Sequence, residues 1–457
     1  MMRTSRALLG SLGLFLLGSV GGCASSEPSN ETVSSGTPEV TEETSVDASE
    51  DEEQESDSGL SQNVTDASES RSLEPVESSD TEGEVDSDAP SDSEVAEDGS
   101  VTEGETLPAF ATKGPYYAGY RVVEWTYDLP GLEEPRTIEI GLWYPTEVAE
   151  GEVIKWGGLL EEEDLYGGAP VIELPDGETF PVRVYTHGDK GLMGDSSNTS
   201  EFFASHGWVT IAPNHTGNTL LDYIMPRPAW MFYARPWDVT QALNFMETIE
   251  GDPLSGKLKL DEVVLMGHSY GGYTGYGLAG ASFDTVMIEE ACQGGEGPLN
   301  GPCTEEQVAQ FSTSVADPRV IAYAPLDGGN QDMYGEAGVQ GISMPMLQMY
   351  AISPEGDAHK GSEAYWSWLQ DHNMVRVGIL GGCHIGFTLG FCEGISDEEN
   401  FGIIHAYLMA FSNHVLLGTQ TEESIGLLLG DWTVSEKVLL ERTDQADSFW
   451  QGVASEL

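Results

Sequence analysis

The strongest structural signal in this chain lies in the segment Asp261-Glu262-Val263-Val264-Leu265-Met266-Gly267-His268-Ser269-Tyr270-Gly271-Gly272. Its apolar run Val263–Met266 is typical of a strand buried on both faces. The next residues fit G-x-S-x-G, and a helix is expected over 273–279. A sharp strand-to-helix turn lifts the Ser269 hydroxyl above the end of a sheet and needs glycines where a Cβ would clash. We therefore interpret Ser269 as a nucleophile; the alternative is a glycine-rich turn around a surface serine.

The first residues have the pattern of a targeting segment. Arg3 and Arg6 precede an apolar stretch from residue 7 to residue 20, which ends in small residues before Cys23. This pattern resembles the bacterial lipoprotein signal, which is cleaved before a cysteine that then carries lipid. On that resemblance, residues 1–22 are the signal peptide and acyl chains on Cys23 provide the only membrane attachment. We expect an exported protein anchored to the bacterial cell envelope, at the outer membrane facing the periplasm or at the cell surface; the alternative is a secreted protein with an incidental Cys23.

Residues 23–107 form a second expected region, an acidic linker. From Ala24 to Leu107 the chain has 27 acidic residues, one basic residue (Arg71) and no aromatic residue. Such a composition buries too little apolar surface to offset chain entropy, so we predict disorder. We interpret the region as a spacer; the alternative is a tail that binds calcium or a cationic partner.

Residues 108–457 have the composition of one large α/β domain with insertions. This domain has 51 acidic and 15 basic residues, and such a charge disfavours nucleic acid and other polyanions. No cluster resembles a metal site, and no glycine-rich loop outside 267–272 resembles a nucleotide fingerprint. We therefore expect neither a metal nor a cofactor.

Strand and helix patterns alternate through the domain, which predicts a mostly parallel sheet with crossover helices. An antiparallel hairpin, Tyr120–Tyr127 with Arg136–Tyr144, is expected before it, followed by an irregular loop over 147–180. A helix is predicted from Arg235 to about Ile249, with Asp238 in its first turn, and a helix over 401–417 is expected to close the domain. The predicted strands of the parallel sheet are 181–185, 208–212, 263–266, 320–327, 344–352 and 375–380.

A base and an acid are needed, because a serine hydroxyl is a poor nucleophile until a histidine whose tautomer is fixed takes its proton. Among nine histidines, only His384 follows a late strand in a glycine-rich loop, last in the order Ser…Asp…His. Asp327 ends the first predicted strand after Ser269, and Asp357 lies five residues beyond the next. Spacing alone leaves both acids open.

Two backbone N–H groups are candidates for an oxyanion hole. The His187-Gly188 pair at a strand end resembles the loop that supplies one oxyanion-hole donor in α/β-hydrolases. On that resemblance, the first donor is the N–H of Asp189. The N–H of Tyr270 is the second candidate, since it directly follows Ser269 at a helix N-terminus, where negative charge is favoured.

Several motifs in order resemble the platelet-activating-factor acetylhydrolase and dienelactone-hydrolase-like branch of the α/β-hydrolases, over about Tyr120 to Leu417. The resemblance implies an α/β-hydrolase fold and an ester hydrolase, and its Leu-Asp pattern favours Asp327 as the acid. A serine, Ser269, stands where true dienelactone hydrolases have a cysteine. The matching motifs are Leu142-Trp143-Tyr144-Pro145, Val184-Tyr185-Thr186-His187-Gly188, Arg235-Pro236-Trp237-Asp238, Gly267-His268-Ser269-Tyr270-Gly271-Gly272, Pro325-Leu326-Asp327 and Cys383-His384-Ile385-Gly386-Phe387.

The four cysteines after Cys23 permit three disulfide pairings, and export permits disulfides to form. Local closure favours Cys292 with Cys303 and Cys383 with Cys392. The second pair brackets His384 in sequence.

The sequence therefore predicts a serine carboxylic-ester hydrolase that forms an acyl-enzyme with a small-molecule ester. In this hypothesis Ser269 attacks the carbonyl, His384 transfers the proton and Asp327 orients His384. Two rivals remain: a non-catalytic surface binding lipoprotein with the same fold, and a peptidase with the same triad. The ester specificity and the oligomeric state stay open.

Overall fold

The computed structural model describes residues 107–156, 160–294, 303–329 and 331–455. The predicted signal peptide, Cys23 and the linker up to residue 106 lie outside the described residues.

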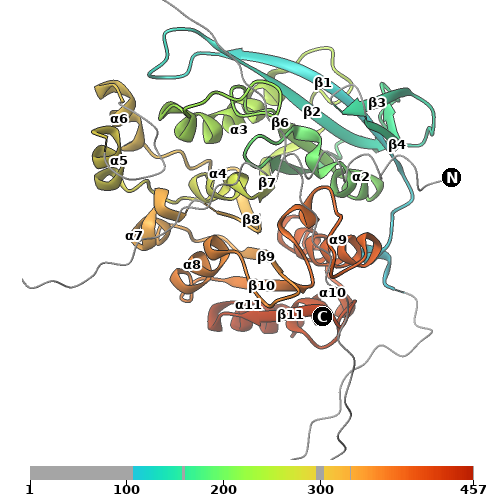
Figure 1. Ribbon diagram of the computed structural model, residues 1–457. Helices are drawn as coiled ribbons and strands as arrows, with labels where there is room; N and C mark the ends of the chain where they lie inside the picture. The colour runs from blue at the N-terminus through green and yellow to red at the C-terminus, as the bar shows by residue number, and fades with distance from the viewer. Residues whose placement is uncertain (1–106, 157–159, 295–302, 330, 456–457) are drawn as a thin grey trace, which may run out of the picture. The chain divides into compact units, whose positions relative to one another are not determined.

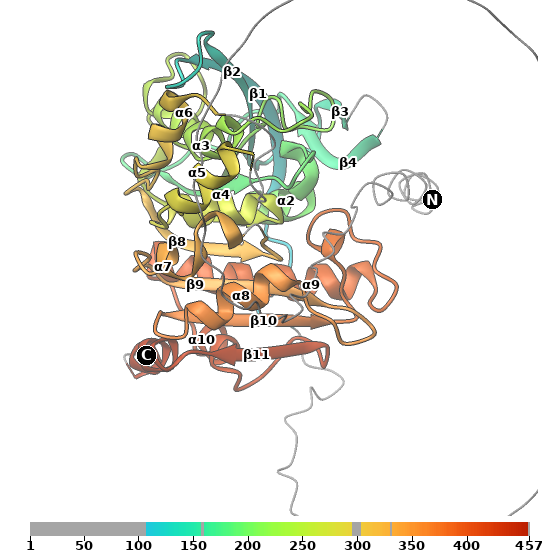
Figure 2. The same ribbon diagram turned by 60° about the vertical axis from the view of Figure 1, so that its left-hand side comes forward.

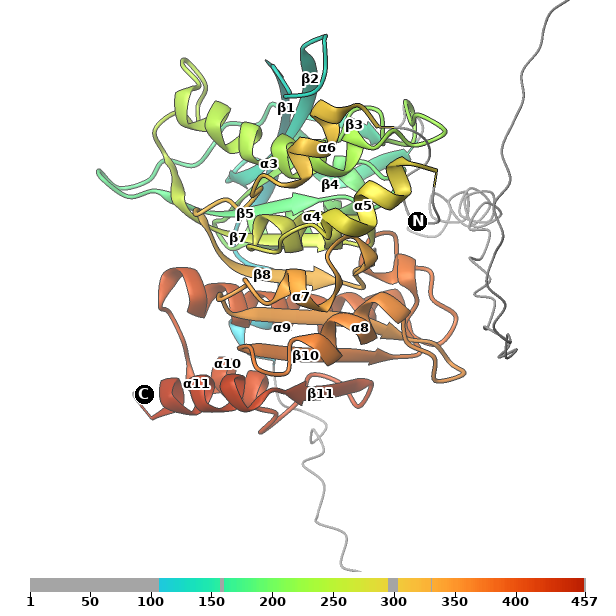
Figure 3. The same cartoon turned by 90° about the vertical axis from the view of Figure 1, so that its left-hand side faces the viewer.

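Within the described residues, eleven strands form one sheet in the order β11-β10-β9-β8-β7-β5-β6-β2-β1-β4-β3. The strands from β10 to β6 in that order are all parallel, so the mostly parallel α/β sheet is as predicted. Figure 3 shows β5, β7, β8 and β10 in this sheet, and the strand order has β9 between β8 and β10. The strands are β1 (Tyr117–Tyr127), β2 (Arg136–Thr146), β3 (Glu152–Trp156), β4 (Leu160–Gly167), β5 (Phe180–Thr186), β6 (Val209–Pro213), β7 (Leu258–His268), β8 (Val320–Leu326), β9 (Met346–Ile352), β10 (Met374–Leu380) and β11 (Val438–Arg442).

Helices cover both faces of the sheet (Figures 1 and 2). Because side chains alternate along a strand, Val263 and Leu265 pack into one core, while Val264 and Met266 pack into the other. The first core lies under α3 (Trp230–Thr248), α4 (Tyr270–Leu278), α5 (Thr285–Cys292), α6 (Glu305–Phe311), α7 (Gly335–Val339) and α8 (Lys360–Trp368). The second lies under α2 (Ser197–Ser205), α9 (Asp397–Ser412), α10 (Glu422–Leu429) and α11 (Asp444–Ala454). Short helical turns are η1 (Ala109–Ala111), η2 (Met193–Ser196), η3 (Gln331–Met333), η4 (His384–Phe387) and η5 (Asn413–Leu417).

The leading hairpin is confirmed, since β1 and β2 pair antiparallel from Tyr117↔Thr146 to Tyr127↔Arg136. The irregular loop over 147–180 was a wrong prediction. It contains β3 and β4, which pair antiparallel, and β4 also pairs with β1. Their strand pattern is weak because they form the sheet's outer edge, and β3 has no buried residue.

Helix α3 corrects a second prediction, because it begins at Trp230 rather than at Arg235 and holds Pro236 in its interior. Proline has no N–H to donate to the carbonyl four residues earlier, which is that of Phe232. The hydroxyl of Tyr273 donates to this carbonyl at 3.2 Å instead. A tertiary contact therefore supplies the hydrogen bond that the proline removes.

The C-terminal part also extends beyond the prediction. Helix α9 and the turn η5 reach Leu417 as expected, but they do not close the domain. Strand β11 follows and pairs antiparallel with β10, so it forms the other edge of the sheet.

Both expected cysteine pairs are at disulfide distance: Cys292–Cys303 with Cα atoms 5.1 Å apart, and Cys383–Cys392 with Cα atoms 5.4 Å apart. Disulfides are typical of exported proteins. In the described part of the chain, no single helix has the length and apolarity needed to cross a membrane. One pair, 397–417 with 422–429, reaches those limits only when combined across a bend of 117°.

Candidate active site

The site lies at the carboxyl edge of the parallel sheet. Loops that follow β5, β7, β8 and β10 meet there, since the carboxyl ends of parallel strands share one edge. Ser269 follows β7, Asp327 follows β8, and His384 lies four residues beyond β10. This arrangement brings His384 into direct contact with Ser269, 115 positions away in the chain, and with Asp327, 57 positions away.

Ser269 stands at a turn between β7 and α4 with φ of 54°, which is rare for a residue with a side chain. Its N–H donates to the carbonyl of Leu326 at 3.0 Å. A Cβ on Gly267 would lie 2.3 Å from the carbonyl oxygen of Gly271, and a Cβ on Gly271 would lie 2.1 Å from that of Thr186. Both glycines are therefore required by close backbone approach, and the backbone of Ser269 is held in a strained conformation.

His384 joins the serine to an acid. Its Nε2 lies 2.7 Å from Oγ of Ser269, and its Nδ1 lies 2.6 Å from Oδ2 of Asp327. With Nδ1–H donating to the carboxylate, Nε2 is free to accept the hydroxyl proton. The His384 side chain is 39% exposed, so solvent or a substrate reaches it.

Asp327 is buried and its carboxylate is well supplied with donors. Oδ1 accepts from the N–H of Ala351 at 3.3 Å and from the hydroxyl of Ser362 at 3.5 Å. Burial by itself raises the pKa of Asp327, but the hydrogen bond and positive potential of His384 outweigh burial, so this pKa lies below its ordinary value. Asp357, the other candidate acid, is exposed, and its N–H donates to Ser353. The structure brings Asp327, not Asp357, to His384.

Two further histidines contact His384, and the sequence analysis missed both. Nε2 of His268 donates to the backbone carbonyl of His384 at 2.8 Å, with the ring centroids 4.7 Å apart. Burial, followed by the proximity of His384, lowers the pKa of His268 to about 3, so His268 is neutral at physiological pH. His359 stacks on His384 with centroids 5.2 Å apart and ring planes at 22°. The signal for His359 was its position in a loop after β9, at the same sheet edge.

The loop after β5 lies against the serine. A Cβ on Gly188 would be 3.2 Å from Cβ of Ser269, so the backbone at Gly188 passes directly beside the nucleophile. Asp189 follows Gly188, and Tyr270 is the first residue of α4, whose initial N–H groups have no partner within the helix. Tyr270 directly follows Ser269, and Asp189 directly follows the residue whose backbone lies beside Ser269.

A buried network holds this loop in place. Arg235 in α3 donates to the carbonyl of His187 and, at 2.6 Å, to Oδ1 of Asn218. Asn218 in turn donates to the Asp189 carboxylate at 2.7 Å. The N–H of His215 donates to Nε2 of His187 at 3.0 Å, which leaves Nδ1–H of His187 to donate to the next carbonyl, that of Gly188. His187 is thus a structural residue, fully buried.

The network extends through His215 to the buried carboxylate of Asp238. This carboxylate accepts from Nε of Arg136 at 2.6 Å, from the hydroxyl of Tyr127 at 2.7 Å and from Nδ1 of His215 at 2.8 Å. Burial raises its pKa, but Arg136 and His215 together lower it to about 2. The expected role of Asp238 in a helix first turn is wrong, because its carboxylate serves as a buried ionic centre. Nε2 of His215 lies 2.7 Å from the Thr186 hydroxyl, an arrangement like that of Ser269 and His384 but fully buried.

The His384 loop is also braced. The Cys383–Cys392 pair spans it, and the side chain of Asn400 in α9 donates to the carbonyl of Gly386 at 2.7 Å. A Cβ on Gly386 would lie 2.7 Å from the sulfur of Cys392. The base is therefore carried by a loop tied at both ends.

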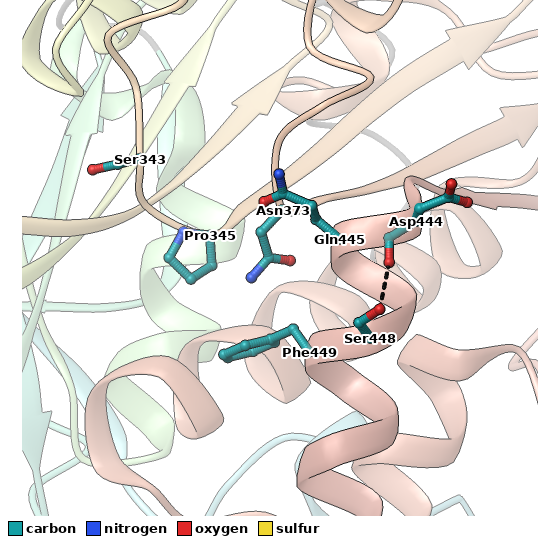
Figure 4. A pocket seen from close by; sticks show the side chains of 7 residues that line it. All are labelled: Ser343, Pro345, Asn373, Asp444, Gln445, Ser448 and Phe449. Atoms are coloured by element: carbon teal, nitrogen blue, oxygen red, sulfur yellow. Dashed lines mark hydrogen bonds between the residues drawn. The ribbon is translucent and has the colours of Figure 1, made fainter.

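A separate surface depression lies at the opposite edge of the sheet (Figure 4). Pro345 precedes β9 and Asn373 precedes β10, so both stand at the amino ends of parallel strands. The other wall comes from α11, including Phe449. None of its lining residues belongs to the site around Ser269. Among the described residues, no group of three or more His, Cys, Asp and Glu is arranged to hold a metal ion.

Comparisons with known proteins add a structural neighbour. No protein-family model matches this chain, and no curated protein matches it. The solved structures that resemble it include a ferulic acid esterase from Streptomyces cinnamoneus, with 17% sequence identity and a TM-score of 0.49. The similarity covers 72% of this chain and 97% of that protein.

Proposed function

We propose that this protein is a serine carboxylic-ester hydrolase with an α/β-hydrolase fold. The observation that supports the proposal is one chain of contacts: Oγ of Ser269 to Nε2 of His384 at 2.7 Å, and Nδ1 of His384 to Oδ2 of Asp327 at 2.6 Å. A serine, a histidine and a buried carboxylate in this order form the arrangement that activates a hydroxyl as nucleophile.

In the first half of the reaction, Oγ of Ser269 attacks the ester carbonyl carbon while its proton passes to Nε2 of His384. Asp327 stabilises the imidazolium that forms. The N–H groups of Tyr270 and Asp189 donate to the oxygen that gains negative charge. His384 then gives its proton to the leaving alcohol oxygen, the carbon–oxygen ester bond breaks, and the acyl group remains on Ser269.

In the second half, water attacks the acyl carbon and loses a proton to Nε2 of His384. The tetrahedral intermediate collapses, the acid product leaves, and Ser269 recovers its proton from His384. No step requires a cofactor. The proposal also includes a lipid anchor at Cys23 and an acidic linker. Both rest on the sequence alone, because these residues lie outside those that the structure describes.

The test is hydrolysis of a short-chain aryl ester, p-nitrophenyl acetate, by wild-type protein and by Ser269→Ala. We expect release of p-nitrophenol by wild type and loss of at least about 1000-fold in kcat for the variant, since the nucleophile is removed. Equal rates for both proteins would contradict the proposal. An amide of the same acyl group, tested in parallel, separates an esterase from a peptidase.

A further inference from the structure

The loop from Thr219 to Arg227, which we name the 219–227 loop, exposes a group of apolar side chains. Fourteen large hydrophobic residues are exposed among the described residues, and four of them fall within five consecutive positions of this loop. Single exposed apolar residues are normal on a protein surface, whereas a contiguous group marks a contact site. The four are Leu221 (74% exposed), Tyr223 (48%), Ile224 (43%) and Met225 (58%).

The loop is ordered by hydrogen bonds within it and with the preceding Gly217. The carboxylate of Asp222 accepts from the N–H of Gly217 at 2.9 Å and from the N–H of Thr219 at 3.0 Å. The N–H of Ile224 donates to the carbonyl of Gly217 at 2.8 Å. The exposed apolar side chains are therefore carried by a backbone that hydrogen bonds hold in place.

Both ends of the loop are attached to the candidate active site. At the first end, the N–H of Leu220 donates to the carbonyl of Gly191, in the loop that also holds Asp189. At the second end, the guanidinium of Arg227 pairs with the Asp189 carboxylate and lies 4.4 Å from the centre of the Tyr270 ring. The loop that carries the exposed apolar side chains is thus joined at both ends to the segments that lie next to Ser269.

The charges near the loop are already engaged with protein groups. Arg227 is paired with Asp189, and the ammonium of Lys190 lies 4.7 Å from the centre of the Tyr223 ring. The Asp222 carboxylate accepts from the N–H groups of Gly217 and Thr219. What the loop offers to a bound molecule is apolar surface.

We propose that the 219–227 loop is an apolar wall of the substrate site, and that the substrates are esters with an extended apolar group, an alkyl chain or an aromatic ring. This inference rests on the proposed function and adds the substrate class. The energetic reason is that removing each methylene group from water is favourable, so a longer apolar group binds more tightly where a matching surface exists.

The experiment uses Leu221→Ser combined with Met225→Ser in the otherwise native chain. These two positions are the most exposed of the four, whereas Tyr223 contacts Lys190 and is left unchanged. Two ester series are measured: p-nitrophenyl esters from acetate to octanoate, and acetates from methyl to benzyl. The readout is the ratio of kcat/KM for the largest member of each series to that for the smallest.

We expect the ratio in at least one series to fall on the order of 10-fold, mainly through KM, since binding of the apolar group is lost. The series that responds tells whether the wall receives the acyl or the alcohol part. Phe449→Ser, an exposed apolar residue at the opposite sheet edge, is the matched control and should leave both ratios unchanged. Unchanged ratios in the loop variant, with Ser269 still labelled by a fluorophosphonate, would overturn this inference alone. Failure of wild type to hydrolyse any ester would instead contradict the proposed function.

Discussion

Nδ1 of His384 lies 2.6 Å from the buried carboxylate of Asp327, while Asp357, the other candidate acid, is exposed. We expect Asp327→Asn to lower kcat on the order of 10,000-fold, because an amide does not hold the imidazole in the required tautomer. Asp357→Asn is the matched control and should stay within about twofold of wild type. The measurement is p-nitrophenyl acetate hydrolysis; full activity in Asp327→Asn would show that another group orients His384.

The two disulfides permit a paired comparison. Cys383 and Cys392 are 9 positions apart, and Cys292 and Cys303 are 11 positions apart, so closing either loop restricts the unfolded chain to a similar extent. Replacing either pair with serines should cost about 3 kcal/mol in the free energy of unfolding. Only the loss of Cys383–Cys392 should also lower kcat, because this pair braces the loop of His384.

Urea unfolding and ester hydrolysis of both double variants provide the two readouts. An equal fall in kcat for both pairs would mean that the disulfide beside His384 has no special role in positioning the base.

Arg136 is the cation that compensates the buried charge of Asp238. Arg136→Ala leaves this carboxylate buried without its ionic partner and should lower the free energy of unfolding by about 3–5 kcal/mol. Lys113→Ala breaks an ion pair with Asp164 whose side chains are 52% and 61% exposed, and should cost less than about 1 kcal/mol. Denaturant titrations measure both values, and comparable losses would contradict the assignment of a buried ionic centre.

His405 should contribute a pH dependence to stability. It is partly buried and stacks on Phe202, with ring centroids 4.2 Å apart, and the loss of hydration lowers its pKa to about 3. The unfolded chain binds a proton below about pH 6.5, whereas the folded protein does not. The contribution of neutral His405 to the free energy of unfolding is therefore fully present above about pH 6.5 and is lost as the pH falls towards 3.

Between pH 6.5 and pH 5, His405→Phe should lose about 2 kcal/mol less of its unfolding free energy than wild type. Buried His215 and His268, whose pKa values are also lowered to about 3, keep a residual dependence in the variant. Urea unfolding at the two pH values is the test, and identical losses in both proteins would contradict it.

Much of the sheet was predictable from sequence, because buried strands leave apolar runs and parallel strands share an edge. That rule placed Ser269, His384 and two candidate acids at one edge, and the family resemblance favoured Asp327 over Asp357; the structure has Ser269, His384 and Asp327 in contact. The start of α3 was not predictable, since the hydrogen bond from Tyr273 that accommodates Pro236 joins elements about 40 residues apart. Local sequence contains no trace of such a contact.

The surroundings of the site were less accessible to sequence analysis. His359 lies beside His384 only because of the conformation of the loop after β9. The buried role of Asp238 depends on Arg136 from another strand, while the pattern around it favoured an ordinary helix start. Strand ends can be inferred from apolar runs, but the pairing of polar side chains between loops depends on tertiary geometry.

The central claim is that Ser269 is an activated nucleophile. Its most direct test is treatment of the folded protein with a fluorophosphonate, followed by peptide mass spectrometry. We predict one adduct, on Ser269, which is absent in Ser269→Ala and strongly slowed in His384→Ala. An unmodified Ser269 in folded wild-type protein, or an adduct on a different serine, would contradict the account.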